Sequence, residues 1–234
     1  MGDYYFFSLN LFPGRRLYLR DIEINSDVDL QAFFYNHPNY QKQVSKTYHT
    51  FLEEHIPLCL NNIIPLFAAN NKKIEIKLAS EVQLSDLQDY NIIYIGPYKT
   101  LYILRTIARN LNYQYYKGTT GSVLAFFCED SNKVIKYSWT DNMTTSARND
   151  FPMVIKVSDT SNRLYIFFLS KHDFGNIATV KYFTDTANLK NFKKRVPTNQ
   201  FEALFEAKGM IRTDFDIKLL LNNTRNSHLQ FKLD

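Results

Sequence analysis

The sequence predicts an α/β fold, a mixed β-sheet flanked by helices, with an N-terminal strand-and-helix segment. Apolar runs rich in aromatic and β-branched residues alternate with amphipathic stretches along the 234 residues. Two segments, residues 91–105 and 164–180, share one pattern: an apolar strand, a polar loop containing glycine, and an amphipathic helix. The chain has no internal repeat and no low-complexity tract, which argues against a solenoid.

The N-terminal residues 4–24 alternate apolar and polar side chains around a Pro-Gly pair. This pattern predicts a strand, a turn and a second strand. A short helix is expected next, because residues 25–27 offer a cap, and it should stop near Pro38, since the residue before a proline resists helical angles. A longer helix is predicted over residues 40–55, where apolar side chains recur at spacings of three and four.

Two prolines interrupt the following stretch, so residues 58–67 are expected to form a kinked or second short helix. The polar run 70–73 is the expected boundary between an N-terminal segment, residues 1–72, and an α/β body, residues 73–234. At the start of the body, residues 74–78 alternate in the manner of a half-buried strand.

Within the body, the unbroken apolar run 91–95 predicts a strand buried on both faces. An amphipathic helix is expected over residues 100–111. The remaining expected elements are strands within 113–137, an exposed polar loop at 140–150, strands at 152–157 and 163–169, a helix at 177–192 and a closing hairpin at 201–221.

The amino-acid composition limits the classes of function that this chain is expected to have. The 28 Lys and Arg against 23 Asp and Glu give a net charge of +5, which favours mild attraction to anions and is too small to indicate nucleic-acid binding. The densest basic run, 190–195, falls at the end of an expected helix, where cations complement the helix dipole. Cys59 and Cys128 lie in apolar runs and are expected to be buried; a disulfide between them stays open as an alternative.

No apolar stretch approaches the roughly 20 residues needed to cross a bilayer, and the first residues lack the pattern of a signal peptide. We therefore expect no membrane segment in this chain. A cytoplasmic location is predicted, with the soluble part of a larger or anchored protein as the alternative.

The loops that follow the two similar strands are the most site-like parts of the chain, because ligands of α/β sheets bind at the carboxyl ends of strands. Gly96 allows a sharp turn or a close approach of the backbone. Thr100 can cap the next helix, whose remaining N–H groups suit a phosphate or carboxylate.

We expect a small anionic ligand to lie between the two loops. Lys99 and Lys171 would supply charge, and Thr100, His172 and Asn176 would supply hydrogen bonds. The full set of predicted ligand-binding residues is Gly96, Tyr98, Lys99, Thr100, Lys171, His172 and Asn176. The alternative is a pair of plain strand-to-helix turns, in which Asp173 or Asn176 caps the helix, since neither a P-loop nor a GxGxxG pattern is present.

No catalytic residue, metal site or cofactor is predicted. His49, Glu53, Glu54 and His55 follow the order H-x-x-x-E-E-H, which differs from the H-E-x-x-H pattern of metal-dependent proteases. On the expected helix these residues would form a surface with one partly buried histidine. The Gly-x-Ser-x-Gly pattern of hydrolases is also absent.

Residues 79–101 read Ala-Ser-Glu-Val-x-Leu-Ser-Asp-Leu-x-x-x-Asn-Ile-Ile-Tyr-Ile-Gly-Pro-x-x-Thr-Leu. This run resembles an uncharacterised bacterial α/β domain in which a strand, a Gly-Gly turn and a helix are followed later by a second such unit. Residues 165–184 would match the later unit, and 201–221 a terminal hairpin. Pro97 stands where the second Gly is usual. The resemblance implies a sensor or regulatory part and transfers no substrate and no catalytic residue.

The predicted function is a non-catalytic ligand-sensing or regulatory domain. The alternative is a protein-interaction or assembly domain, with a protein partner or a second copy of the chain in place of a small molecule. An enzyme of unrecognised type is a third interpretation. Nucleic-acid binding is the least favoured.

Overall fold

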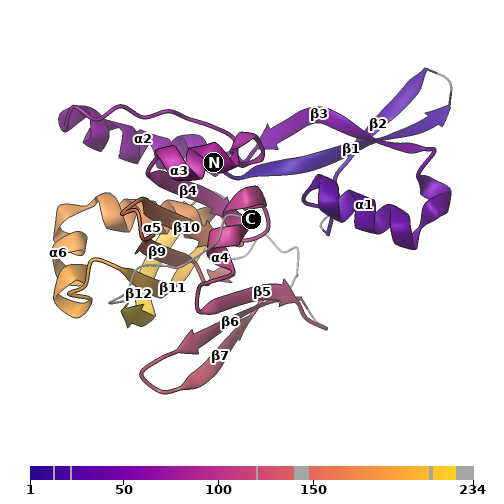
Figure 1. The fold of residues 1–234 in the computed structure, drawn as a ribbon. Coiled ribbons are helices and arrows are strands. Elements are labelled where there is room, and N and C mark those ends of the chain that lie inside the picture. The colour runs from indigo at the N-terminus through magenta and orange to yellow at the C-terminus, as the bar shows by residue number, and fades with distance from the viewer. Residues whose placement is uncertain (13, 22, 120, 140–147, 211–212, 225–234) are drawn as a thin grey trace.

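The computed structural model describes the chain except for residues 13, 22, 120, 140–147, 211–212 and 225–234. The predicted α/β class is confirmed, because helices pack on a mixed central sheet (Figure 1). Two further three-stranded sheets accompany the central one in the described part of the chain. One of them, with its helix, extends to the right in Figure 1.

The extending sheet is formed by β1 (Asp3–Phe12), β2 (Arg15–Leu19) and β3 (Val44–Leu52), in the antiparallel order β2-β1-β3. The expected strand, turn and strand at its start are therefore confirmed. Helix α1 (Asp27–Asn36) follows, with the Ser26 side chain accepting a hydrogen bond from the Asp29 N–H at its cap. A 3-10 turn, η1 (Pro38–Tyr40), follows α1. Leu30 and Phe34 of α1 pack on Tyr5 and Phe7 of β1, forming a small separate core.

The helix predicted over residues 40–55 is wrong, because most of this stretch is strand β3. Strand β1 has two edges; β2 pairs with one and β3 with the other. The valine, threonine and aromatic residues of β3 suit a sheet, and this preference together with pairing outweighs the accidental helical spacing. Helix α2 (His55–Ala69) begins only after the strand, so the helix expected over residues 58–67 is confirmed, and Pro65 lies inside it.

The central sheet contains β4 (Ile92–Pro97), β9 (Met153–Ser158), β10 (Leu164–Ser170), β11 (Phe201–Met210) and β12 (Thr213–Thr224), in the order β12-β11-β9-β10-β4. A short strand, β8 (Arg148–Asp150), also pairs with β11. Only β4 and β10 run parallel within this order; the other pairs are antiparallel. The predicted strands and the closing hairpin are confirmed.

Both faces of the central sheet are covered. On one face lie α2, α5 (Asp173–Thr184) and α6 (Thr186–Arg195), with Ile56, Ile177 and Phe192 against Phe168 of β10. On the other face lie β5 (Tyr113–Lys117), β6 (Ser122–Cys128) and β7 (Lys133–Ser138), with α3 (Leu84–Asp89) and α4 (Arg105–Ala108). This double cover is why β4 and β10 are apolar at nearly every position.

Several local expectations differ from the structure. Residues 74–78 form no strand, and a 3-10 turn, η2 (Ala79–Glu81), follows them. The helix expected over 100–111 is only a 3-10 turn, η3 (Tyr102–Leu104), and one turn of α4, and Tyr102 at the start of η3 has a left-handed φ of 46°. The helix expected over 177–192 is two helices, since the Asp185 side chain caps α6 by accepting from the Asn188 N–H.

Two further expectations can be compared with the structure. Cys59 and Cys128 are both buried and free, as the apolar runs around them indicate. Of the loop expected at 140–150, residues 148–150 form strand β8, and residues 140–147 lie outside the described residues. In the part of the chain that is described, no helix combines the length and the apolar character needed to span a bilayer.

Candidate functional site

The loops after β4 and β10 lie side by side at the carboxyl edge of the central sheet. Parallel pairing brings Ser170 opposite Pro97, and the Tyr98 N–H donates to the Ser170 carbonyl oxygen at 3.3 Å. The expectation that both loops open at one edge of one sheet is therefore confirmed, whereas a ligand pocket shared by the two loops stays a prediction.

Four of the predicted ligand-binding residues point into the protein. Gly96 approaches the backbone of Gly2 so closely that an added Cβ would lie 2.7 Å from the Gly2 Cα. The Tyr98 hydroxyl donates to the Phe151 carbonyl at 2.7 Å, and the Thr100 hydroxyl lies 2.9 Å from the Tyr94 hydroxyl. These three residues hold the first loop from within. The fourth, Asn176, is fully buried and belongs to a different cluster, described below.

The two predicted lysines belong to a group of cations at this edge. The Lys99 side chain is 20% exposed, and burial lowers the pKa of its ammonium. Repulsion from Arg20, Lys171 and Lys117 lowers this pKa further, while Glu23, 3.8 Å away, opposes the shift. Each lysine ammonium also lies over an aromatic ring: Lys99 is 5.9 Å from the centre of Tyr115, and Lys171 is 5.6 Å from the centre of Trp139.

The buried carboxylate of Asp150 fixes the backbone of the loop after β10 by hydrogen bonds. Asp150 accepts hydrogen bonds from the backbone N–H groups of Lys171 (3.4 Å), His172 (2.9 Å) and Phe151 (2.8 Å), and from the Trp139 indole (3.0 Å). Burial raises the pKa of Asp150, and His172 and the backbone donors oppose this. The sequence offered no signal for this role, because Asp150 ends a polar stretch that resembles an ordinary loop.

His172, the last of the predicted residues, is half-buried at the cap of α5. Its ring stacks on Phe174, with ring centres 5.6 Å apart. The pKa of the imidazole is lowered, because burial disfavours its charged form more than the negative charge of Asp150 favours it. The charges of both Asp150 and Lys171 therefore act on the His172 ring.

A second polar cluster lies at the same end of α5. His55 is fully buried, and its Nδ1 lies 3.1 Å from Glu53 Oε2 and 3.2 Å from Asp173 Oδ1. Its Nε2 lies 3.1 Å from the Asn176 amide nitrogen. Burial raises the pKa of Glu53, while His55 and a hydrogen bond from Tyr4 oppose this. The sequence pattern predicts a helix surface with one partly buried histidine here, because the helical spacing extends through the residues that form β3.

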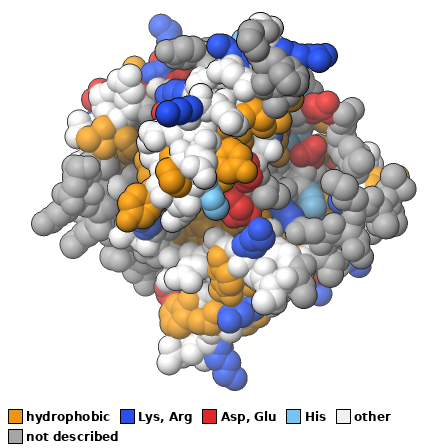
Figure 2. All heavy atoms as spheres, turned by 90° about the vertical axis from the view of Figure 1, so that its right-hand side faces the viewer, with side chains coloured by type: hydrophobic (Ala, Val, Ile, Leu, Met, Phe, Trp, Pro, Cys, Tyr) orange, Lys and Arg blue, Asp and Glu red, His pale blue; other side chains and the backbone are white. Residues whose placement is uncertain are grey.

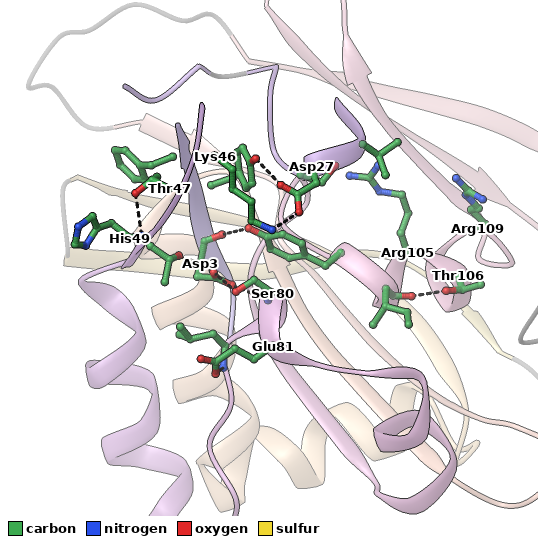
Figure 3. Close-up of a pocket in the computed structure, with 18 residues that line it drawn as sticks. Asp3, Asp27, Lys46, Thr47, His49, Ser80, Glu81, Arg105, Thr106 and Arg109 are labelled. Carbon is green, nitrogen blue, oxygen red and sulfur yellow. Dashed lines mark hydrogen bonds and ion pairs between the residues drawn. The ribbon is translucent and has the colours of Figure 1, made fainter. Parts of the chain in front are cut away.

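A cavity of about 650 Å³ lies elsewhere, between β1 and β3 on one side and η2, η3 and α4 on the other (Figure 3). None of the seven predicted residues lines it. The three acids labelled in Figure 3 have partners: Asp27 pairs with Lys46, Asp3 accepts from the Ser80 hydroxyl at 2.7 Å, and Glu81 accepts from the Leu78 N–H at 3.2 Å. The cavity is a groove of mixed charge beside the small N-terminal sheet, and one of its lining residues, Arg105, donates a hydrogen bond to the Lys99 carbonyl oxygen at 3.3 Å.

The chain matches no protein-family model, no curated protein and no solved structure. The resemblance to an uncharacterised bacterial α/β domain therefore stays a prediction, and the function is argued from the site alone.

Proposed function

We propose that this chain is a non-catalytic ligand-sensing or regulatory domain that binds a small anionic ligand at the carboxyl edge of β4 and β10. The observation that carries the proposal is that Lys99 and Lys171 lie over two neighbouring rings, Tyr115 and Trp139, whose centres are 5.9 Å apart, so that both ammonium groups lie at that edge. A half-buried ammonium among like charges is stabilised when an anion binds beside it.

The surroundings of the lysines support a small, rigid ligand. The Tyr115 and Trp139 rings lie beneath the two ammonium groups and orient them. Asp150 holds the backbone of Lys171 and His172, and the buried Tyr98 and Thr100 hold the backbone on either side of Lys99. Charged groups on a loop fixed in this way lose little entropy on binding, which favours affinity for a phosphate or carboxylate.

Calorimetric titration with ATP, ribose 5-phosphate and citrate, in buffer containing EDTA, tests the proposal. We expect at least one of these anions to bind, and Lys99→Ala and Lys171→Ala each to weaken binding about tenfold, because a hydrogen bond to a charged group contributes roughly 1.5–3 kcal/mol. Lys190→Ala, which removes an exposed lysine of α6, is the matched control and should change nothing. Absence of binding by all three anions, or equal affinity in the Lys99 and Lys171 variants, would contradict the proposal.

A second candidate function, assembly with another copy of the chain, is favoured by helix α1. Val28 is 76% exposed and Tyr35 is 88% exposed, although both are large and apolar. Figure 2 looks onto the side of the molecule that bears α1 and shows hydrophobic side chains as several patches between charged groups. Patches of this kind mark interaction surfaces when they are contiguous.

Light scattering over a range of concentrations distinguishes the two functions. If α1 mediates assembly, the measured mass rises with concentration, and the double variant Val28→Ser, Tyr35→Ser remains a single chain. Val134→Ser, at a 57% exposed position of β7, is the control and should assemble normally. A mass that stays at that of one chain at every concentration would exclude self-assembly through α1.

A further inference from the structure

The cluster at the start of α2 and α5 has a composition that the proposed anion site does not use. Glu53 directly follows β3, His55 is the first residue of α2, and Asp173 is the first residue of α5. We propose that Glu53, His55 and Asp173 together bind one divalent transition-metal ion, with Zn²⁺ as its best-fitting representative.

The spacing of the three side chains suits a common ion. His55 Nδ1 lies 3.1 Å from Glu53 Oε2 and 3.2 Å from Asp173 Oδ1, and one ligand atom from each residue lies within 4.8 Å of the others. Ligands at about 2.0–2.2 Å from one Zn²⁺ stand roughly 3–3.5 Å apart in a tetrahedral arrangement. The ion would therefore fit with small movements of side chains and without movement of the backbone.

Unpartnered polar atoms point to a ligand at this position. Within the described residues, four buried side-chain polar atoms have no hydrogen-bond partner, and three of them are Glu53 Oε1, His55 Nδ1 and Asn176 Oδ1. His55 Nδ1 is near two carboxylates, yet it makes no well-aligned hydrogen bond to either of them. A buried polar atom left in this state costs about 1–3 kcal/mol, and a cation between the three side chains would remove most of that cost.

Asn176 is placed to orient the imidazole. A metal at Nδ1 requires the proton on Nε2, which lies 3.1 Å from the Asn176 amide. With the amide oxygen turned toward the ring, Asn176 accepts the Nε2–H and fixes the tautomer that leaves the Nδ1 lone pair for the ion. Histidine ligands are commonly held in this way by a polar partner on the other ring nitrogen.

Charge and access both agree with a divalent cation. The two carboxylates bring two negative charges into a site where Glu53 is 7% exposed and His55 is fully buried. One imidazole nitrogen and two carboxylate oxygens suit Zn²⁺ or Mn²⁺, whereas Mg²⁺ prefers oxygen ligands alone. The Asp173 side chain is 35% exposed, so an ion can reach the cluster from that side.

Calorimetric titration of the EDTA-treated and dialysed protein with ZnCl₂, without any organic anion, tests the proposal. We expect one ion per chain and a raised midpoint of thermal unfolding, with MgCl₂ giving neither effect. Asp173→Asn and Glu53→Gln should each weaken Zn²⁺ binding by more than about 100-fold, since even outer partners of a metal site contribute 10–100-fold. Asn176→Ala should weaken it by about tenfold, because this residue acts only through the imidazole.

His49→Ala is the matched control, because His49 is an exposed histidine that packs on Tyr18 in β2 and should leave the affinity unchanged. The absorption spectrum with CoCl₂ should show the visible d–d bands of bound metal and no near-ultraviolet sulfur-to-cobalt charge-transfer band, which excludes binding through Cys59 or Cys128. Because Asp173 is partly exposed, Asp173→Asn should fold, and circular dichroism verifies this. The absence of Zn²⁺ binding, or binding that Asp173→Asn and Glu53→Gln leave intact, overturns the metal site. Neither result affects the anion proposal, which is tested in EDTA.

Discussion

Asp150→Ala is expected to lower the free energy of unfolding by about 3–5 kcal/mol, because several buried N–H donors lose their acceptor at about 1–3 kcal/mol each. The substitution leaves the Trp139 indole and the backbone N–H groups of Phe151 and His172 without their acceptor in a fully buried position. Denaturant unfolding measures the loss. Because Trp139 is the only tryptophan, its fluorescence also reports directly on the broken indole hydrogen bond.

Asp130→Ala is the matched control for this prediction. Asp130 is exposed in the turn after β6, so its removal should change stability by less than about 0.5 kcal/mol. The proposed role of Asp150 in positioning Lys171 and His172 adds a second readout, since the variant should bind anions more weakly even where it remains folded. A stability loss below about 1 kcal/mol would mean that water replaces the carboxylate, and the described role would be wrong.

Gly175→Ala is expected to destabilise the protein by about 1–3 kcal/mol, the usual cost of overpacking. Gly175 lies inside α5, where helix propensity alone would make alanine better by nearly 1 kcal/mol. An alanine Cβ there would lie only 2.2 Å from Asp150 Oδ2 and 2.9 Å from Ser170 Cβ. The close approach therefore decides the sign, and denaturant unfolding gives the measurement.

The double variant isolates this cause. If the clash with Asp150 is responsible, Gly175→Ala should cost clearly less in the Asp150→Ala background than in the native chain, because the blocking carboxylate is then absent. A stabilising Gly175→Ala, or equal costs in the two backgrounds, would show that α5 and β8 do not approach as closely as described.

Much of the central body follows from local sequence pattern. The apolar runs of β4 and β10, each ending in a polar loop, predicted two strands and the position of the loops that follow them. Runs of this kind can be recognised without knowledge of the fold, because burial on both faces demands apolar side chains at nearly every position. Lys99 and Lys171 could be predicted to lie at the edge of the sheet because each comes shortly after one of these strands.

The direction of the other predicted side chains could not be obtained from such patterns. Thr100 and Tyr98 carry polar groups that suit a ligand, yet their hydroxyls bond to Tyr94 and to the Phe151 carbonyl. Asn176 lies 121 positions after His55, and only packing of α5 on α2 brings their side chains together. Polar residues after a strand thus mark an edge of the sheet, and the neighbours in space decide which of them reach solvent.

The amino-acid sequence by itself determined the α/β class, the strands of the central sheet and the edge at which its two loops open, since these depend on the order of apolar and polar residues along short segments. Only the tertiary structure decided that residues 44–52 pair with β1 as a strand, that Asp150 supports the second loop, and that Glu53, His55 and Asp173 meet. The reason is physical: strand pairing and buried polar contacts join segments far apart in the chain, and no local pattern records their partners.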